Sequence, residues 1–188
     1  MGIISLIIIL LSISTGCFAI GVTSGSKLGS CYKSSVALKT TLVFVVTSLL
    51  ALSLSFIVGK LLQPYVANVS IWIAFSMFFL VGVRLLMESI EKAPSLNYTD
   101  IVQSSYLIKV AVQASIDTFM FGFVLALVAP RLLLGGLFFS ALFTFISTTL
   151  GLSHGHSFTK TVLGNRLQLI AGIVMIVIAV RYIIIANG

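Results

Sequence analysis

Six long apolar stretches limit what this chain can fold into more than any other feature of the sequence. They cover about residues 3–23, 36–58, 70–91, 107–129, 132–152 and 167–186. A helix rises about 1.5 Å per residue, so each stretch is long enough to cross the roughly 30 Å hydrocarbon core of a bilayer. The sequence therefore predicts an all-α, polytopic membrane protein with six transmembrane helices.

The composition agrees with this fold class and narrows the function. Of 188 residues, 59% are hydrophobic and 8% are charged, whereas a soluble domain has about 25% charged residues. The loops are too short for a soluble catalytic domain and no nucleophile stands beside a base, so we do not expect an enzyme. The net charge of +7 comes from basic residues scattered near helix ends. This distribution indicates contact with the lipid bilayer and no nucleic-acid partner.

The basic residues are divided unequally between the two sides of the predicted membrane domain. One side carries Lys27, Lys33, Lys39, Arg84, Lys92, Lys109, Lys160 and Arg166, and the other carries Lys60, Arg131 and Arg181. Cytoplasmic loops are enriched in Lys and Arg. We therefore expect the first loop to lie in the cytoplasm and both termini to lie outside.

The sequence contains an internal repeat, which is seen when it is aligned with a copy of itself shifted by about 100 positions. The matching segments are residues 14–21 with 115–122, 47–52 with 147–152, and 73–84 with 170–181. In the first match Ser, Phe and Gly recur in register, and Gly16 faces Asp117. Three matches in the same order indicate two copies of a three-helix unit.

An odd number of spans in each copy makes the second copy enter the membrane from the opposite face. We therefore predict two inverted three-helix repeats, residues 1–95 and 104–188, which together form one transmembrane domain. Inverted repeats are common in secondary transporters, which handle their substrate near the bilayer midplane where the halves meet. Small residues such as Gly16, Gly21 and Gly122 would let helices approach closely, which is a packing role that needs no ligand.

Asp117 is the acidic residue that most strongly indicates a site. Three of the four acids, Glu88, Glu91 and Asp100, lie at or beyond the end of the third span, whereas Asp117 lies well inside the fourth. A carboxylate at the centre of a membrane helix costs about 2.5–3.5 kcal/mol on insertion scales. Such a residue marks a functional site unless it serves helix packing through hydrogen bonds to Ser or Thr, or is held neutral.

Hydroxyl groups would gather around this acid if the repeat brings its halves together. Hard cations such as Mg²⁺ and Mn²⁺ prefer oxygen ligands of this kind. Hydroxyls in membrane helices also serve as contacts between helices without any ligand, so both interpretations stay open. The predicted metal-ligating residues are Asp117, Ser115, Ser14, Ser48 and Thr148.

Other polar residues near the helix ends have structural interpretations. Arg84 and Glu88 are four positions apart on the third helix and can pair. Arg84 and its repeat partner Arg181 are interpreted first as interface anchors and second as gating charges. The His154-Gly155-His156 segment is expected in a loop after the fifth helix, where it is a weak metal signal.

Short motifs spread over nearly the full length belong to one known pattern. They are residues 14–21, 72–75, 82–89, 114–117, 147–151 and 167–183. Together they resemble the MntP-type manganese efflux pumps, which are small six-helix proteins of bacterial inner membranes. The resemblance implies an inverted-repeat carrier that exports Mn²⁺ as its substrate and needs no resident cofactor.

The chain departs from this family at two acidic positions. The family pattern has Asp in the first helix, within Ser-x-Asp-x-Phe-Ala, where this chain has Gly16. It also has an acid in the second helix about where Ser48 stands, so Asp117 alone carries over. One hypothesis is a divergent carrier that handles a divalent cation or a less demanding solute, using Asp117 with hydroxyls, Cys17 or a second subunit of a homodimer. The other is a transporter-derived protein that has kept a structural or regulatory role in the membrane.

Overall fold

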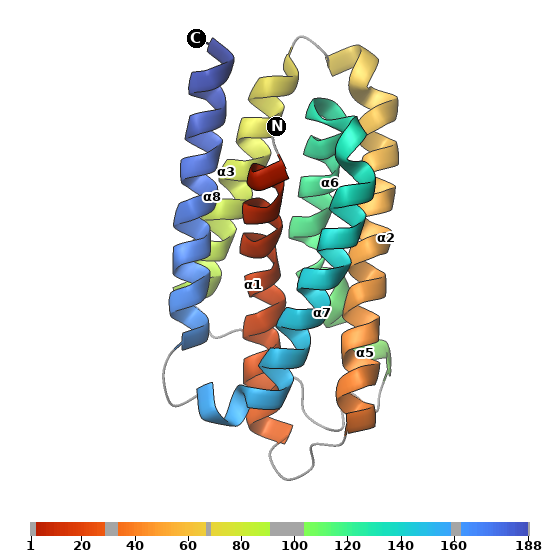
Figure 1. The fold of residues 1–188 in the computed structure, drawn as a ribbon, viewed down its shortest axis with the longest axis vertical. Helices are drawn as coiled ribbons and strands as arrows, with labels where there is room; N and C mark the ends of the chain where they lie inside the picture. Colours follow the sequence, from red (N-terminus) through yellow and green to blue (C-terminus); the bar gives the residue numbers. More distant parts are fainter. Residues whose placement is uncertain (1–2, 29–33, 67–68, 91–103, 159–162, 188) are drawn as a thin grey trace.

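The regular structure of the described residues is helical, as the sequence predicts. The computed structural model describes residues 3–28, 34–66, 69–90, 104–158 and 163–187. The helices stand side by side as an upright bundle, and α1 begins toward the same end at which α8 finishes (Figure 1). They are α1 (Ile3–Leu28), α2 (Ser34–Val66), α3 (Ser70–Ile90), α5 (Ser104–Ala114), α6 (Ile116–Val128), η3 (Pro130–Leu132), α7 (Leu133–Phe158) and α8 (Leu163–Asn187).

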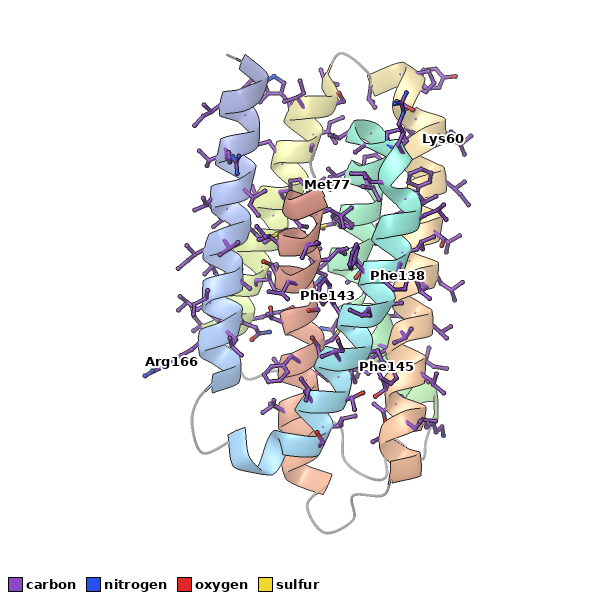
Figure 2. All side chains as sticks on the ribbon, viewed as in Figure 1. Lys60, Met77, Phe138, Phe143, Phe145 and Arg166 are labelled. Carbon is purple, nitrogen blue, oxygen red and sulfur yellow. The ribbon has the colours of Figure 1, made fainter. Side chains whose placement is uncertain are left out.

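Most of these helices are long and apolar enough to cross a membrane. Within the described residues five candidate spans are found: Leu6–Gly25, Ala37–Val66, Ser70–Ile90, Leu107–Val128 and Pro130–Ser153. The sixth expected span falls on α8, a helix of 25 residues. Large apolar side chains, among them Phe138 and Phe145, project from the outside of the bundle (Figure 2). An apolar exterior of this extent is a surface for lipid, and the chain is a multi-pass membrane protein.

The fourth span is interrupted at Ser115, between α5 and α6. The amide of Ser115 donates to the carbonyls of both Ala111 and Val112, which tightens the end of α5. Its hydroxyl donates to Ala111 O at 2.8 Å. A serine side chain that competes with the backbone for an acceptor favours a bend in a helix. No Pro or Gly stands here, so the sequence pattern carried no sign of a break.

Two helix ends differ from the predicted ones. α2 continues to Val66 with Pro64 inside its last turn. α7 continues to Phe158, so the backbone of His154-Gly155-His156 is helical and the prediction of a loop there was wrong. The side chains of that segment lie outside the part of the chain whose side chains are described. Between α6 and α7, Pro130 begins the short helix η3.

The helices pack mainly across the two predicted repeats. α1 lies along α7, α2 lies along α5 and α6, and α3 lies along α8. Glycines allow two of these approaches, as predicted for Gly21 and Gly122. A Cβ atom built on Gly151 would lie 2.7 Å from the Phe18 carbonyl oxygen, and one on Gly122 would lie 2.8 Å from the Leu52 carbonyl oxygen. Gly21 meets Gly151, with 3.1 Å between its built Cβ and Gly151 Cα.

The buried apolar side chains form two clusters at different depths of the bundle. The larger one, here called the terminal cluster, lies toward the end where α1 begins and includes Leu6, Ile9, Leu52, Phe78, Phe121 and Met175. The smaller one, the loop cluster, lies nearer the opposite end and includes Cys17, Phe44, Leu107, Ala111 and Leu152. The residues between these clusters on α1, α2, α7 and the span made of α5 and α6, together with polar residues of α3 and α8, form the candidate site.

Candidate functional site

A layer of polar side chains separates the terminal cluster from the loop cluster. On α2, for example, Ser48 lies between Phe44 of one cluster and Leu52 of the other. Burying polar groups at one depth is unfavourable unless they find partners. The polar layer consists of Ser14, Ser48, Arg84, Glu88, Ser115, Asp117, Ser147, Thr148 and Gln168.

Asp117 occupies the centre of this layer and the first turn of α6. Its side chain is 3% exposed. The break at Ser115 places Asp117 in the first turn of α6, where the helix dipole favours a negative charge.

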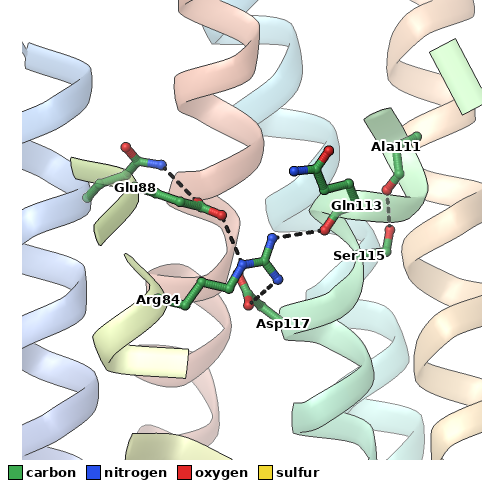
Figure 3. A network of polar contacts seen from close by, with 7 residues as sticks. Arg84, Glu88, Ala111, Gln113, Ser115 and Asp117 are labelled. Atoms are coloured by element: carbon green, nitrogen blue, oxygen red, sulfur yellow. Dashed lines mark hydrogen bonds and ion pairs between the residues drawn. The ribbon is translucent and has the colours of Figure 1, made fainter. Parts of the chain in front are cut away.

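Arg84 on α3 is the direct counter-ion of Asp117. Its Nη1 donates to Asp117 Oδ1 at 3.0 Å and its Nε donates to Glu88 Oε1 at 2.9 Å. Its Nη2 donates to the carbonyl oxygen of Gln113, in the last turn of α5, at 3.1 Å. Figure 3 shows the guanidinium lying between the two carboxylates. One cation thus joins α3 to both sides of the interrupted span.

This arrangement corrects the interpretation of Arg84. The predicted pair with Glu88 is confirmed, but the primary role as an interface anchor was wrong, because the guanidinium contacts a buried acid. A signal was available in the sequence. Asp117 is the acid placed deep in a span, and a buried carboxylate needs a partner of opposite charge. Arg84 lies inside the third predicted span and could supply that charge.

Gln168 on α8 extends the network and was missed entirely. Its Nε2 donates to Glu88 Oε2 at 3.4 Å. The residue is 1% exposed, and its Oε1 has no hydrogen-bond partner among the described atoms. A polar side chain near the start of the last apolar stretch was the only sequence signal for it. The polar network therefore runs from α8 through α3 to α6.

The four predicted hydroxyl ligands all lie in the polar layer, in two different states. Ser14 donates to Leu11 O at 2.9 Å and accepts from Ser147 at 3.2 Å, and Ser115 is bonded to Ala111. Ser48 and Thr148, which are partners in the predicted repeat, are each 1% exposed, and their hydroxyls have no partner in the described part of the chain. Arg84, and none of these hydroxyls, bonds the Asp117 carboxylate within the described residues.

The first helix contributes space and a thiol. A Cβ atom built on Gly16 meets no atom within 4 Å, so Gly16 is not the close-contact residue that we predicted. Cys17 is buried with a free thiol and lies within electrostatic range of Asp117 and Glu88. Among the described residues, no three His, Cys, Asp or Glu side chains come together as a metal-binding group.

An apolar groove runs beside the helix break on the lipid-facing side. Its volume is about 390 Å³ and Ser115 is at its wall, with Thr47, Leu50, Ala51, Leu54, Val112, Ile116 and Phe119. Thr47 donates to carbonyls of its own helix, Val43 O and Phe44 O. The lining is apolar apart from Thr47 and Ser115, whose hydroxyls donate to carbonyls within their own spans.

Comparison with known proteins places the chain in a family. A family profile described as "Putative manganese efflux pump" (Mntp) matches residues 31–183. The chain belongs to this family. A relative from Serratia proteamaculans is 25% identical over 180 residues, which cover 95% of this chain and 93% of the relative. One from Salmonella newport is 28% identical over 177 residues, which cover 93% of each. Both are named as manganese efflux pumps MntP, and no solved structure matches the chain significantly.

Membership of the MntP family confirms the resemblance drawn from the motifs. A third relative, from Crocosphaera subtropica, is 24% identical over 174 residues, covering 93% of this chain and 91% of the relative. The alignments thus extend over nearly the whole membrane domain. The family is one of pumps, in agreement with the expectation that this chain is not an enzyme.

Proposed function

We propose that this chain is a secondary transporter that exports Mn²⁺ across the bacterial inner membrane. Its relatives are named manganese efflux pumps and align over more than nine-tenths of the chain. The observation that carries the proposal is Asp117, a carboxylate 3% exposed at a helix break in the middle of the bundle. Ionisable residues at such positions mark ion pathways in membrane proteins.

The polar layer offers the donor type that a hard cation prefers. Carboxylate, hydroxyl and carbonyl oxygens suit Mn²⁺, whereas soft sulfur donors select other metals. The predicted ligands are Asp117 with Ser115, Ser14, Ser48 and Thr148. The unpartnered hydroxyls of Ser48 and Thr148 support this set, because buried polar groups without partners are costly and an ion would satisfy them.

The packing supports an inverted-repeat carrier made of residues 1–95 and 104–188. In such an arrangement the contact of the first helix with the fifth is equivalent to that of the fourth with the second. Both pairs, α1 with α7 and α2 with α5 and α6, pack extensively. The terminal cluster and the loop cluster would then be the two barriers that open in turn around the polar layer.

Orientation follows the distribution of charge, with both termini outside. Lys60 and Arg166 lie toward opposite ends of the bundle (Figure 2), as this topology requires. Reporter fusions after Gly188 and within residues 92–106 are expected to report opposite sides. Equal answers from the two fusions would contradict the six-span topology. The homodimer suggested by the sequence is also a prediction. Crosslinking in membranes should then trap a species of twice the mass of the chain.

Export itself is tested in cells that lack their own manganese exporter. Expression of the chain should lower cellular Mn²⁺ and restore growth in excess Mn²⁺, and Asp117→Asn should abolish both effects. Asp100→Asn, which removes an acid outside the predicted spans, is the matched control. If cellular Mn²⁺ does not change although the protein reaches the membrane, the proposal is wrong. That result would favour a structural or regulatory role.

A further inference from the structure

The guanidinium of Arg84 is surrounded by oxygen atoms that together resemble a cation site. Asp117 Oδ1, Glu88 Oε1 and the Gln113 carbonyl oxygen lie 2.9–3.1 Å from its three nitrogens. These oxygens come from α6, α3 and α5. In carriers with interrupted helices, the carbonyls at the end of a half-helix are used to coordinate cations. Here a side chain of the protein occupies such a place.

The charges at this place do not balance. Glu88 and Asp117 together carry two negative charges when both are ionised, and Arg84 supplies one positive charge. A divalent cation in the position of the guanidinium would neutralise the two carboxylates completely. Because charges in a medium of low dielectric interact strongly, this difference favours the dication over a single guanidinium.

Gln168 gives an independent indication that the network is incomplete. Its amide lies against Glu88 and the residue is 1% exposed, yet its Oε1 has no partner within the described residues. An amide oxygen is a ligand for hard cations. Because a half-turn about the last side-chain bond exchanges the amide oxygen and nitrogen, a cation beside Glu88 would give this oxygen a partner.

We propose that Arg84 occupies, in the empty carrier, the position of the transported dication, which binds between Asp117 and Glu88 and displaces the guanidinium. The inference rests on the proposed function and adds Glu88, Gln113 O and Gln168 to the ion site. The long, partly exposed side chain of Arg84, 24% exposed, can swing away while remaining attached to α3.

Displacement explains why a transporter would keep a basic residue at a cation site. An export cycle must return the empty site across the membrane, and two bare carboxylates in a low-dielectric interior are strongly unfavourable. Arg84 neutralises one of these charges during the return. It is a positioning residue that competes with the ion and then replaces it.

The first test measures Mn²⁺ binding to the purified full chain in detergent by electron paramagnetic resonance, which detects free Mn²⁺. Glu88→Gln leaves the pair of Arg84 with Asp117 in place, so the protein should fold. We expect this change to weaken Mn²⁺ binding by about tenfold or more, because losing even a residue that supports a metal ligand costs about that much, and Asp117→Asn to do the same. Glu91→Gln, three positions along the chain, is the matched control and should bind as the unmodified chain does.

The second test separates a competitor from a structural residue. Arg84→Gln should strengthen Mn²⁺ binding, by about tenfold if the guanidinium vacates the site in a tenth of the molecules. The same change should slow Mn²⁺ export into vesicles, because the empty return then leaves both carboxylates without a counter-ion. Arg84→Lys keeps the charge but not the fork of donors, and its affinity should fall between the two.

Three outcomes decide the inference. Unchanged Mn²⁺ affinity in Glu88→Gln, or weaker affinity in a monodisperse Arg84→Gln or Arg84→Lys protein, would overturn the displacement and leave manganese export standing. If the Arg84 variants do not fold, the Mn²⁺ affinity of Glu88→Gln compared with that of Glu91→Gln decides the inference. If the unmodified chain neither binds nor exports Mn²⁺, the proposed function and this inference fail together.

Discussion

At the scale of single residues, Gly16 offers the clearest experiment. The family pattern has Asp where this chain has Gly16, and a side chain built there meets nothing within 4 Å. We expect Gly16→Asp to fold normally and to raise Mn²⁺ export, because it adds a carboxylate, the kind of oxygen ligand that hard dications prefer. Efflux from cells, scaled to the amount of folded protein, is the measurement.

Gly16→Asn is the control, since it fills nearly the same volume without adding a charge. It should export at the rate of the unmodified chain. Equal gains from Asn and Asp would show that volume matters at this position and that charge does not. A gain that survives Asp117→Asn would place the ion away from Asp117.

The residues of the candidate site were predictable to different degrees. Asp117 was found from the sequence because a lone acid in an apolar stretch has few structural explanations. The hydroxyls of Ser14, Ser48, Ser115 and Thr148 were placed at the right depth by the repeat. Their individual partners were not predictable, since a hydroxyl bonds to its own helix as readily as to a neighbour.

At the scale of helices, close packing on α7 depends on one glycine. A Cβ on Gly151 would lie 2.7 Å from Phe18 O and 2.9 Å from Gly21 Cα, and neither backbone atom can move alone. We expect Gly151→Ala to lower the free energy of unfolding by about 1–3 kcal/mol, the usual cost of overpacking. Thermal unfolding in detergent measures this.

Gly135 provides a matched control on the same helix. A Cβ there meets no atom within 4 Å, so Gly135→Ala should stabilise α7 slightly, by up to about 1 kcal/mol, because Ala is the better helix former. Opposite signs for the two changes would agree with the observed packing of α1 on α7. Equal melting temperatures would contradict it.

The interruption of the fourth span leads to a second prediction for an element. Ser115→Ala removes the hydroxyl that bonds to Ala111 O, so α5 and α6 should align more closely and shift Asp117. We expect Mn²⁺ export to fall by about tenfold, because the change removes a predicted ligand and also the support of Asp117. Thr47→Ala removes a hydroxyl at the same groove whose bonds within the described residues go to Val43 O and Phe44 O of its own helix, and export should not change. Equal export in both variants would show that the hydroxyl does not shape the break.

The helices themselves were predicted well because hydrophobic length is a direct requirement of the bilayer. The extension of α7 to Phe158 was not predicted, since polar residues past the apolar stretch continue a helix without any hydrophobic signal. The break at Ser115 was missed for a different reason. It arises from a side-chain hydrogen bond, and a serine is compatible with both straight and bent helices.

At the scale of the whole molecule, the dominant contacts join residues 1–95 to residues 104–188. α1 packs on α7, α2 on α5 and α6, and α3 on α8. We therefore expect either segment expressed alone to be degraded, and the two expressed together to restore membrane protein and Mn²⁺ export. Immunoblots of membranes from the three strains measure this. Stable accumulation of residues 1–95 alone would show that contacts within the segment suffice.

The double pairing of Arg84 also has a consequence for how the chain is made. Asp117 follows Arg84 by 33 residues, a delay of about 2–7 s at bacterial translation rates of roughly 5–20 residues per second. Throughout this interval α3 contains its own acid, Glu88, one helical turn away at 2.9 Å. The translocon therefore receives a helix whose basic residue is already neutralised, and α3 can leave for the lipid before its later partner exists. When Asp117 is synthesised, Nη1 of the guanidinium is still available to pair with its carboxylate, because Glu88 pairs with Nε. Neither Arg84 nor Asp117 therefore has to enter the bilayer as an unpaired charge.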